Sequence, residues 1–217
     1  MGFRDRTHAG RVLGELLRGD YAGSGDLLVL GLPRGGVPVA FEVAQELGAE
    51  LDVFVVRKLG VPGHEELAMG ALASGGIRVL NDTVVAELEI GEVMIARAAA
   101  TESAELERRE RAYRGDRAPV EASGRTVLLV DDGLATGSTM RAAALAVRAQ
   151  DPERLVVAVP VAAEQTCDEF RADVDEIVCA FTPEPFHAVG LWYEDFAPTS
   201  DDEVRELLAR AAAAPTQ

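Results

Sequence analysis

Short apolar runs alternate along the chain with stretches in which apolar residues recur at helical spacing. The apolar runs predict five buried β-strands: Leu27–Leu30, Asp52–Val56, Thr126–Val130, Leu155–Val159 and Glu176–Phe181. Helical spacing predicts helices over residues 37–47, 138–150 and 164–172. Strands that alternate with helices favour a parallel sheet covered on both faces. The pattern therefore predicts the α/β fold class, with a five-stranded parallel sheet flanked by helices.

A long interruption, Leu59–Arg125, separates the second and third predicted strands. It opens with glycine and proline and continues as a predicted hairpin, with strands Ala68–Leu72 and Ile77–Leu80. A charged helix is then expected from about Glu92 to Arg114. Its arginines are interpreted as a solvated face, with ligand binding as the alternative: Arg108, Arg109, Arg111 and Arg114.

The composition narrows the class of partners. With 217 residues, 48 % of them hydrophobic, the chain can bury one sizeable core. Its formal net charge of −16 would repel DNA or RNA, so no nucleic-acid partner is expected. No apolar run approaches the length of a membrane span, so no membrane partner is expected. Cys167 and Cys179 lack metal-ligand spacing and are expected to be reduced in a cytoplasmic protein.

The most specific motif begins where the third predicted strand ends. That strand leads into two adjacent carboxylates, Asp131 and Asp132, and then into the loop Thr136–Thr139, which opens a helix. Glycine lets backbone N–H groups approach an anion, the hydroxyls add donors, and a helix N-terminus favours negative charge. The motif therefore predicts a phosphate-binding loop at the carboxyl edge of the sheet. The ending Gly-Lys-Ser/Thr of a P-loop is missing, which disfavours an ATPase, and a plain helix cap is the alternative.

Basic residues follow the first and second predicted strands. After the first strand, Gly35 and Gly36 permit backbone conformations closed to other residues, and Arg34 supplies a cation. By itself this pattern is also typical of an ordinary strand-to-helix turn. Arg57 and Lys58 are expected at the carboxyl end of the second strand, where two cations could neutralise an anion. Simple solvent exposure is the alternative for both.

Aromatic residues gather near the end of the chain, in the segment Phe186–Phe196. The segment stands out because aromatic residues make up only 5 % of the sequence, and Trp192 is its only tryptophan. Two interpretations stay open. The segment is either a small satellite core, packed against a last amphipathic helix over residues 200–212, or a hood that covers a bound base.

Together, the acidic pair, the Thr-Gly loop and the Arg-Gly-Gly turn resemble the signature of the type I phosphoribosyltransferases, over about residues 27–181. The resemblance implies that Asp131 and Asp132 hold the ribose hydroxyls of 5-phosphoribosyl-1-pyrophosphate, directly or through Mg²⁺. It also implies a loop for the 5-phosphate, formed by Ala135, Thr136, Gly137, Ser138 and Thr139. Asp131 and Asp132 are thus the expected metal ligands, and Mg²⁺ is the expected cofactor.

The same resemblance assigns the basic residues. Arg34, Gly35 and Gly36 are similar to the pyrophosphate loop of bacterial xanthine-guanine phosphoribosyltransferases. Arg57 and Lys58 match the position of a basic site that helps to bind pyrophosphate in the family. Both clusters are therefore expected to neutralise the leaving group.

The remaining segments also have counterparts in the family. Leu59 to about Leu80 lies where the family has a flexible loop that excludes water from the active site. The aromatic segment is loosely similar to the hood of the 6-oxopurine enzymes, and Trp192 is the residue expected to stack on the base. The implied domains are a core over 1–185, which contains the lid and helical insertion of about 59–125, and a hood over 186–217, with the N-terminal helix as a candidate addition.

The sequence departs from the family at two positions of the acidic loop. The 6-oxopurine enzymes have an aspartate where this chain has Ala135, which instead resembles the adenine enzymes, and Gly133 replaces an apolar residue. The acceptor is therefore left open. The expected activity is transfer of a phosphoribosyl group to a small-molecule nitrogen acceptor with release of pyrophosphate. The alternative is a non-catalytic protein that senses the same ligand, and a homodimer is one option for the assembly.

Overall fold

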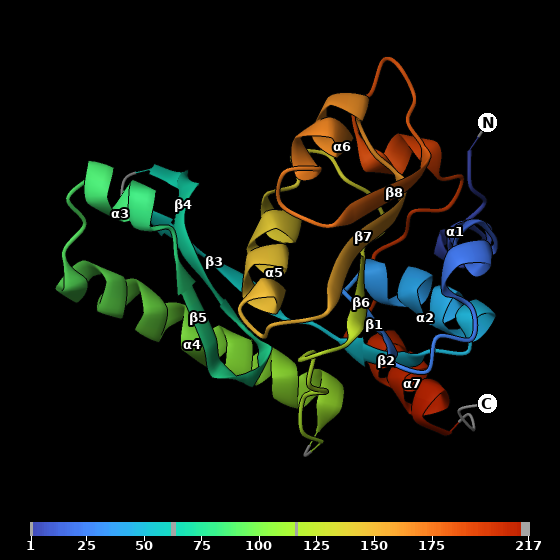
Figure 1. Ribbon diagram of the computed structural model, residues 1–217, viewed down its shortest axis with the longest axis horizontal. Helices are drawn as coiled ribbons and strands as arrows, with labels where there is room; N and C mark the ends of the chain where they lie inside the picture. The colour runs from blue at the N-terminus through green and yellow to red at the C-terminus, as the bar shows by residue number, and fades with distance from the viewer. Residues whose placement is uncertain (1, 62–63, 116, 214–217) are drawn as a thin grey trace.

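Five parallel strands form the central sheet of the computed structural model, which describes residues 2–61, 64–115 and 117–213 (Figure 1). The strand order is β2-β1-β6-β7-β8, and every neighbouring pair is parallel. The strands are β1 (Leu27–Gly31), β2 (Glu50–Val53), β6 (Thr126–Val130), β7 (Arg154–Val161) and β8 (Glu176–Phe181). This arrangement confirms the predicted α/β fold with its five-stranded parallel sheet.

Helices cover both faces of the sheet. On one face, α1 (Arg6–Tyr21) and α2 (Gly36–Leu47) share a core with β1, β6 and β7. On the other face, α5 (Ser138–Arg148) and α6 (Glu164–Phe170) share a second core with the same strands. α7 (Asp201–Ala213) packs beside α2 and β2. β1, β6 and β7 are apolar and buried on both faces, which is why their sequences read as continuous apolar runs.

The second strand ends earlier than predicted. β2 stops at Val53, although Phe54 N still donates to the carbonyl oxygen of Gly31 in β1 at 3.0 Å, and from Val55 onward the backbone pairs outside the central sheet. Val55 N donates to Ser74 Oγ at 3.0 Å, and Ser74 N donates to Val55 O at 2.9 Å. The chain then begins β3 (Val56–Val61). The prediction that Arg57 and Lys58 end a parallel strand is therefore wrong, since both lie on β3 in a separate antiparallel sheet.

The long interruption of the sequence forms this second sheet and two helices. β3 pairs with β4 (His64–Ala73), and β4 pairs with β5 (Ile77–Leu80), which confirms the predicted hairpin. A short helix that was not predicted, α3 (Asp82–Glu87), precedes α4 (Glu92–Arg114). α4 packs on β3 and β4, and in Figure 1 the whole insertion projects to the left of the central sheet.

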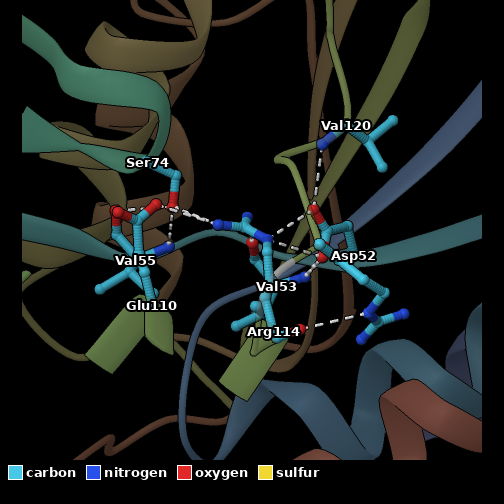
Figure 2. Close-up of polar contacts among 8 residues, drawn as sticks. Asp52, Val53, Val55, Ser74, Glu110, Arg114 and Val120 are labelled. Carbon is cyan, nitrogen blue, oxygen red and sulfur yellow. Dashed lines mark hydrogen bonds and ion pairs between the residues drawn. The ribbon is translucent and has the colours of Figure 1, made fainter. Parts of the chain in front are cut away.

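The last residue of α4 is an arginine anchored inside the protein (Figure 2). Arg114 Nε lies 2.9 Å from Asp52 Oδ2, and Arg114 Nη1 lies 3.0 Å from Glu110 Oε1. The guanidinium also donates to Ser74 Oγ and to the carbonyl oxygen of Val53. Only 6 % of Arg114 and 5 % of Asp52 are exposed. The predicted solvated face is therefore wrong for Arg114, because the end of α4 lies against the end of β2.

A disulfide bond joins Cys167 of α6 to Cys179 of β8. The expectation of two reduced cysteines is therefore wrong for this structure. The two residues are twelve apart in sequence, but α6 packs against the edge strand β8 and brings them together. Within the described ranges, no helix is both long enough and apolar enough to cross a membrane.

Candidate active site

Asp131 and Asp132 follow β6 at the carboxyl edge of the central sheet. Asp131 Oδ1 accepts a hydrogen bond from the backbone N–H of Asp132 at 2.8 Å. Asp132 Oδ2 lies 2.8 Å from Arg6 Nε, in an ion pair whose side chains are 15 % and 12 % exposed. Among the described residues, no hydrogen bond or ion pair engages Asp131 Oδ2 or Asp132 Oδ1. Each carboxylate therefore has one oxygen that a ligand could use.

Burial controls the charge of this acidic pair. It raises the pKa of Asp131 well above the usual value, and the neighbouring charge of Asp132 raises that pKa further. Burial also raises the pKa of Asp132, but the charge of Arg6 and its hydrogen bond oppose this effect. A proton therefore competes with any cation for these oxygens, and a bound divalent cation would favour the ionised carboxylates.

The turn after β1 packs directly against the acidic pair. A Cβ at Gly35 would lie 2.1 Å from Asp132 Oδ2, and a Cβ at Gly36 would lie 2.7 Å from the carbonyl oxygen of Val130. Both distances are shorter than such atoms can approach. The obstacle at Gly36 is backbone, so only glycine fits there, whereas a side chain at position 35 would have to displace the carboxylate of Asp132. Leu32 N also donates to the carbonyl oxygen of Val130 at 2.9 Å. The fold thus brings Gly35 and Gly36 of the Arg-Gly-Gly turn onto the acidic pair.

The Thr-Gly loop presents hydroxyl groups at the start of α5. The exposed residues of the loop are Ala135, Thr136, Ser138 and Thr139. Gly137 has a φ of +69°, a conformation that favours glycine, and a Cβ there would lie 2.5 Å from the ring of Phe170. Thr166 Oγ1 of α6 donates to the carbonyl oxygen of Ala135 at 2.8 Å, which fixes the other end of the loop. The loop therefore has the exposed donors and the helix N-terminus that phosphate binding requires.

A cavity of about 380 Å³ lies between the start of β3, the loop after β1 and the start of α5. Three cationic side chains line it: Arg57, Lys58 and Arg109. Its other lining residues are Leu32, Pro33, Val55, Val56, Thr139 and Ala142, and the acidic pair is not among them. Cations that converge in a protein with a net charge of −16 indicate an anionic ligand. The cavity therefore brings Arg57 and Lys58 together with Arg109, and the first two reach it from β3.

Arg34 and Trp192 are predicted site residues that contact neither the cavity nor the acidic pair. Arg34 Nη1 lies 3.7 Å from Asp201 Oδ1 at the start of α7, and both side chains are exposed. Trp192 packs edge-to-face on Phe181, with ring centroids 5.3 Å apart. Its Nε1 is buried and has no hydrogen-bond partner among the described residues. The satellite-core interpretation accounts for these ring contacts, and base stacking by Trp192 stays a prediction.

Arg6, the first residue of α1, was not among the predicted site residues. Its Nε pairs with Asp132, its Nη1 donates to the carbonyl oxygen of Ala197 at 2.7 Å, and its guanidinium lies 4.0 Å from the ring centroid of Phe196. Tyr193 makes a second link, because its hydroxyl donates to the carbonyl oxygen of Asp132 at 2.6 Å. The acidic pair is thus tied to the aromatic segment. Arg6 and Asp132 are 126 residues apart, so no local pattern could have shown this contact.

The aromatic segment also packs on the N-terminus and on the acidic loop. Phe3 N donates to the carbonyl oxygen of Trp192 at 2.7 Å, and Glu194 N donates to that of Phe3 at 2.8 Å. A Cβ at Gly133 would lie 2.5 Å from Val189 Cγ1, so the segment itself occupies the space that a side chain would need. This contact explains the glycine at that position. The division into a core over 1–185 and a hood over 186–217 stays a prediction.

Comparison with known proteins identifies the family. A family model described as "Phosphoribosyl transferase domain" matches residues 7–188. Two Mycobacterium tuberculosis proteins, from strains CDC 1551 / Oshkosh and ATCC 25618 / H37Rv, carry the name "Putative phosphoribosyl transferase" and are each 46 % identical over 209 residues. The chain belongs to the phosphoribosyl transferase domain family, which confirms the resemblance. The matches cover 96 % of this chain and 47 % of each relative, so the chain spans about half the length of the curated relatives it matches.

Solved structures agree with the fold. The crystal structure of TT1426 from Thermus thermophilus is 44 % identical, with a TM-score of 0.88, and the match covers 97 % of this chain and 99 % of that chain. The structure of the AQ2163 protein from Aquifex aeolicus is 13 % identical, with a TM-score of 0.50 and coverage of 85 % and 76 %. The first therefore shares nearly the whole architecture, and the second shows likeness of fold alone.

The acidic pair fits a hard divalent cation only in part. Among the described residues, no group of three or more His, Cys, Asp or Glu side chains could hold a metal. Two carboxylates with one uncommitted oxygen each can supply two oxygen ligands. Mg²⁺ commonly binds to one or two carboxylates and completes its shell with water and substrate phosphates. The residues present therefore suit a cation that arrives with a phosphorylated substrate.

Proposed function

We propose that this chain is a Mg²⁺-dependent phosphoribosyltransferase that uses 5-phosphoribosyl-1-pyrophosphate as donor and a nucleobase as nitrogen acceptor. One observation carries the proposal. The end of β6 presents Asp131 and Asp132 between the Gly35–Gly36 turn and the Thr-Gly loop at the start of α5. A phosphorylated ribose needs oxygen ligands beside groups that bind phosphate, and both the turn and the loop adjoin the acidic pair.

In the proposed reaction, the bond between ribose C1 and pyrophosphate breaks and a bond from the acceptor nitrogen to C1 forms, with inversion. The acceptor nitrogen loses its proton, and pyrophosphate leaves. Asp131 and Asp132 orient the ribose, and the exposed donors of the Thr-Gly loop hold the 5-phosphate. Arg57 and Lys58 neutralise the charge that develops on the leaving group, since both line the cationic cavity. The chemistry that Mg²⁺ would supply when bound is further neutralisation of these phosphate oxygens.

The test is a panel of nucleobases and amines, scored for release of pyrophosphate from the donor in the presence of Mg²⁺. We expect pyrophosphate to be released with at least one acceptor. No release is expected when that acceptor is left out or when a chelator is added. Donor binding without release for any acceptor would contradict the enzyme and favour the sensing protein. No binding of donor at all would contradict both.

Two substitutions should separate the two phosphate sites. Lys58→Ala is expected to weaken pyrophosphate binding by about tenfold or more, with a smaller effect on ribose 5-phosphate, because the lost charge-assisted contact lies in the cationic cavity. Thr136→Val is expected to do the reverse, because it removes an exposed hydroxyl from the Thr-Gly loop. Calorimetric titration of both ligands measures the effect. Equal losses for both ligands in both variants would show that the loops are assigned wrongly.

A further inference from the structure

The face of α4 that packs against the rest of the protein includes an arginine, Arg109. Residues 102, 106, 109 and 113 recur at helical spacing and therefore share one side of α4. Two of them, Leu106 and Tyr113, are each only 4 % exposed. Arg109 lies between them, and 31 % of its side chain is exposed. An arginine in a buried stripe needs a polar environment to face, and the cavity lined by Arg57 and Lys58 provides one.

Contacts at several points hold this stripe in place. Glu102 Oε2 accepts from Arg57 Nε at 2.6 Å, which ties α4 to β3. The network of Arg114 ties the end of the helix to β2 and to the hairpin. Arg109 lies between these two anchors, and its Nε donates to Glu105 Oε1 at 2.7 Å. These contacts of the fold therefore position its guanidinium.

The charges around the cavity favour an anion. Arg57, Lys58 and Arg109 all line it, and no carboxylate is among its described lining residues. The glutamates that pair with the two arginines each engage the Nε nitrogen. A multiply charged anion in this cavity would be attracted by all three cationic residues at once. Thr139, from the loop assigned to the 5-phosphate, lines the same cavity, so the anion would lie beside that loop.

We propose that Arg109 is a third cationic ligand of the pyrophosphate group, contributed by the helical insertion. This inference rests on the proposed function and adds a binding residue to it. α4 would then act as part of the substrate site as well as a cover for the hairpin.

Arg108 provides a matched control for the test. It is adjacent in sequence, its Nε lies 2.8 Å from Oε2 of the same Glu105, and 59 % of its side chain is exposed. It is not among the residues that line the cavity. Arg109→Gln and Arg108→Gln therefore each remove one positive charge and one ion pair with Glu105. Only Arg109→Gln removes a cation from the cavity.

The experiment is calorimetric titration of inorganic pyrophosphate, and separately of ribose 5-phosphate, into the whole chain with excess Mg²⁺. Arg109→Gln is expected to weaken pyrophosphate binding about tenfold or more, and ribose 5-phosphate binding less than about threefold. Arg108→Gln should change neither by more than about twofold. Arg109→Lys should recover part of the pyrophosphate affinity, since it restores a point charge. Thermal unfolding of each variant shows whether α4 stays packed.

Three results would overturn the inference. Equal pyrophosphate affinity in the Arg109→Gln and Arg108→Gln variants would show that the cavity cation is not used. Equal loss for both ligands, together with a lower melting temperature and no recovery in Arg109→Lys, would show a purely structural role. A wild-type chain that binds neither ligand would overturn this inference and the proposed function together, whereas the first two results leave the proposed function intact.

Discussion

Replacing Asp131 and Asp132 together by asparagine is expected to abolish Mg²⁺-dependent binding of 5-phosphoribosyl-1-pyrophosphate, with at least about a hundredfold loss of affinity. Asparagine keeps the shape of the side chain but removes the negative charge that attracts a cation. Calorimetric titration of the donor with and without Mg²⁺ measures the loss. We expect a large difference between the two titrations for the wild type and none for the double variant.

The same variant should remain folded. Burial raises the folded-state pKa of both aspartates, so ionising them costs stability once the pH exceeds their unfolded pKa. Neutral asparagines avoid that cost, although Arg6 loses its charged partner. A matched control is Asp20→Asn with Asp26→Asn, which changes the net charge equally at two exposed positions. Unchanged donor affinity in a folded Asp131→Asn, Asp132→Asn variant would contradict the assignment of the acidic pair.

Arg114→Ala is expected to lower the free energy of unfolding by about 3–5 kcal/mol. The substitution leaves Asp52 buried without its ion-pair partner, and it also removes the donors to Ser74 and Val53. Removing one partner of a buried pair costs more than the pair itself contributes, because the remaining charge is neither solvated nor compensated. Denaturant unfolding followed by circular dichroism gives the value.

Arg111→Ala is the control for Arg114→Ala. Arg111 lies on the same helix, and 74 % of its side chain is exposed. Its substitution should change stability by no more than about 0.5 kcal/mol. Adding Asp52→Asn to Arg114→Ala should recover part of the loss, since it removes the uncompensated charge. Equal stability of the Arg111→Ala and Arg114→Ala variants would show that the buried network contributes nothing.

The central fold was predictable because its patterns are strong and local. The apolar runs of β1, β6 and β7 and the helical spacing of α2 and α5 each lie within a few residues, and the structure confirms them. The end of β2 was not predictable, because it depends on Ser74 and Arg114, which are distant in sequence. The sequence shows that Asp52–Val56 is rich in β-branched residues, but not which of its backbone groups pair within the sheet.

The candidate site shows the same division between local and distant information. Asp131, Asp132 and the Thr-Gly loop form one continuous motif, so they could be identified before the fold was known. Arg6 reaches Asp132 only through the packing of α1, and no spacing rule predicts it. The surroundings of Arg109 carry a local sequence signal. Its neighbours on the helix face, Leu106 and Tyr113, mark that face as buried, although the run of arginines made it look solvated.

The burial of Arg114 bears on how freely segments can be exchanged between relatives. The residues between β2 and β6 look like a separable module in Figure 1, but the last helical residue of that module completes the interior of the central domain. A chimera that replaced this module with a short loop would remove Arg114 and leave the buried carboxylate of Asp52 without its ion-pair partner. Grafting would therefore need a compensating change at Asp52, and the insertion and the sheet are expected to unfold as one cooperative unit.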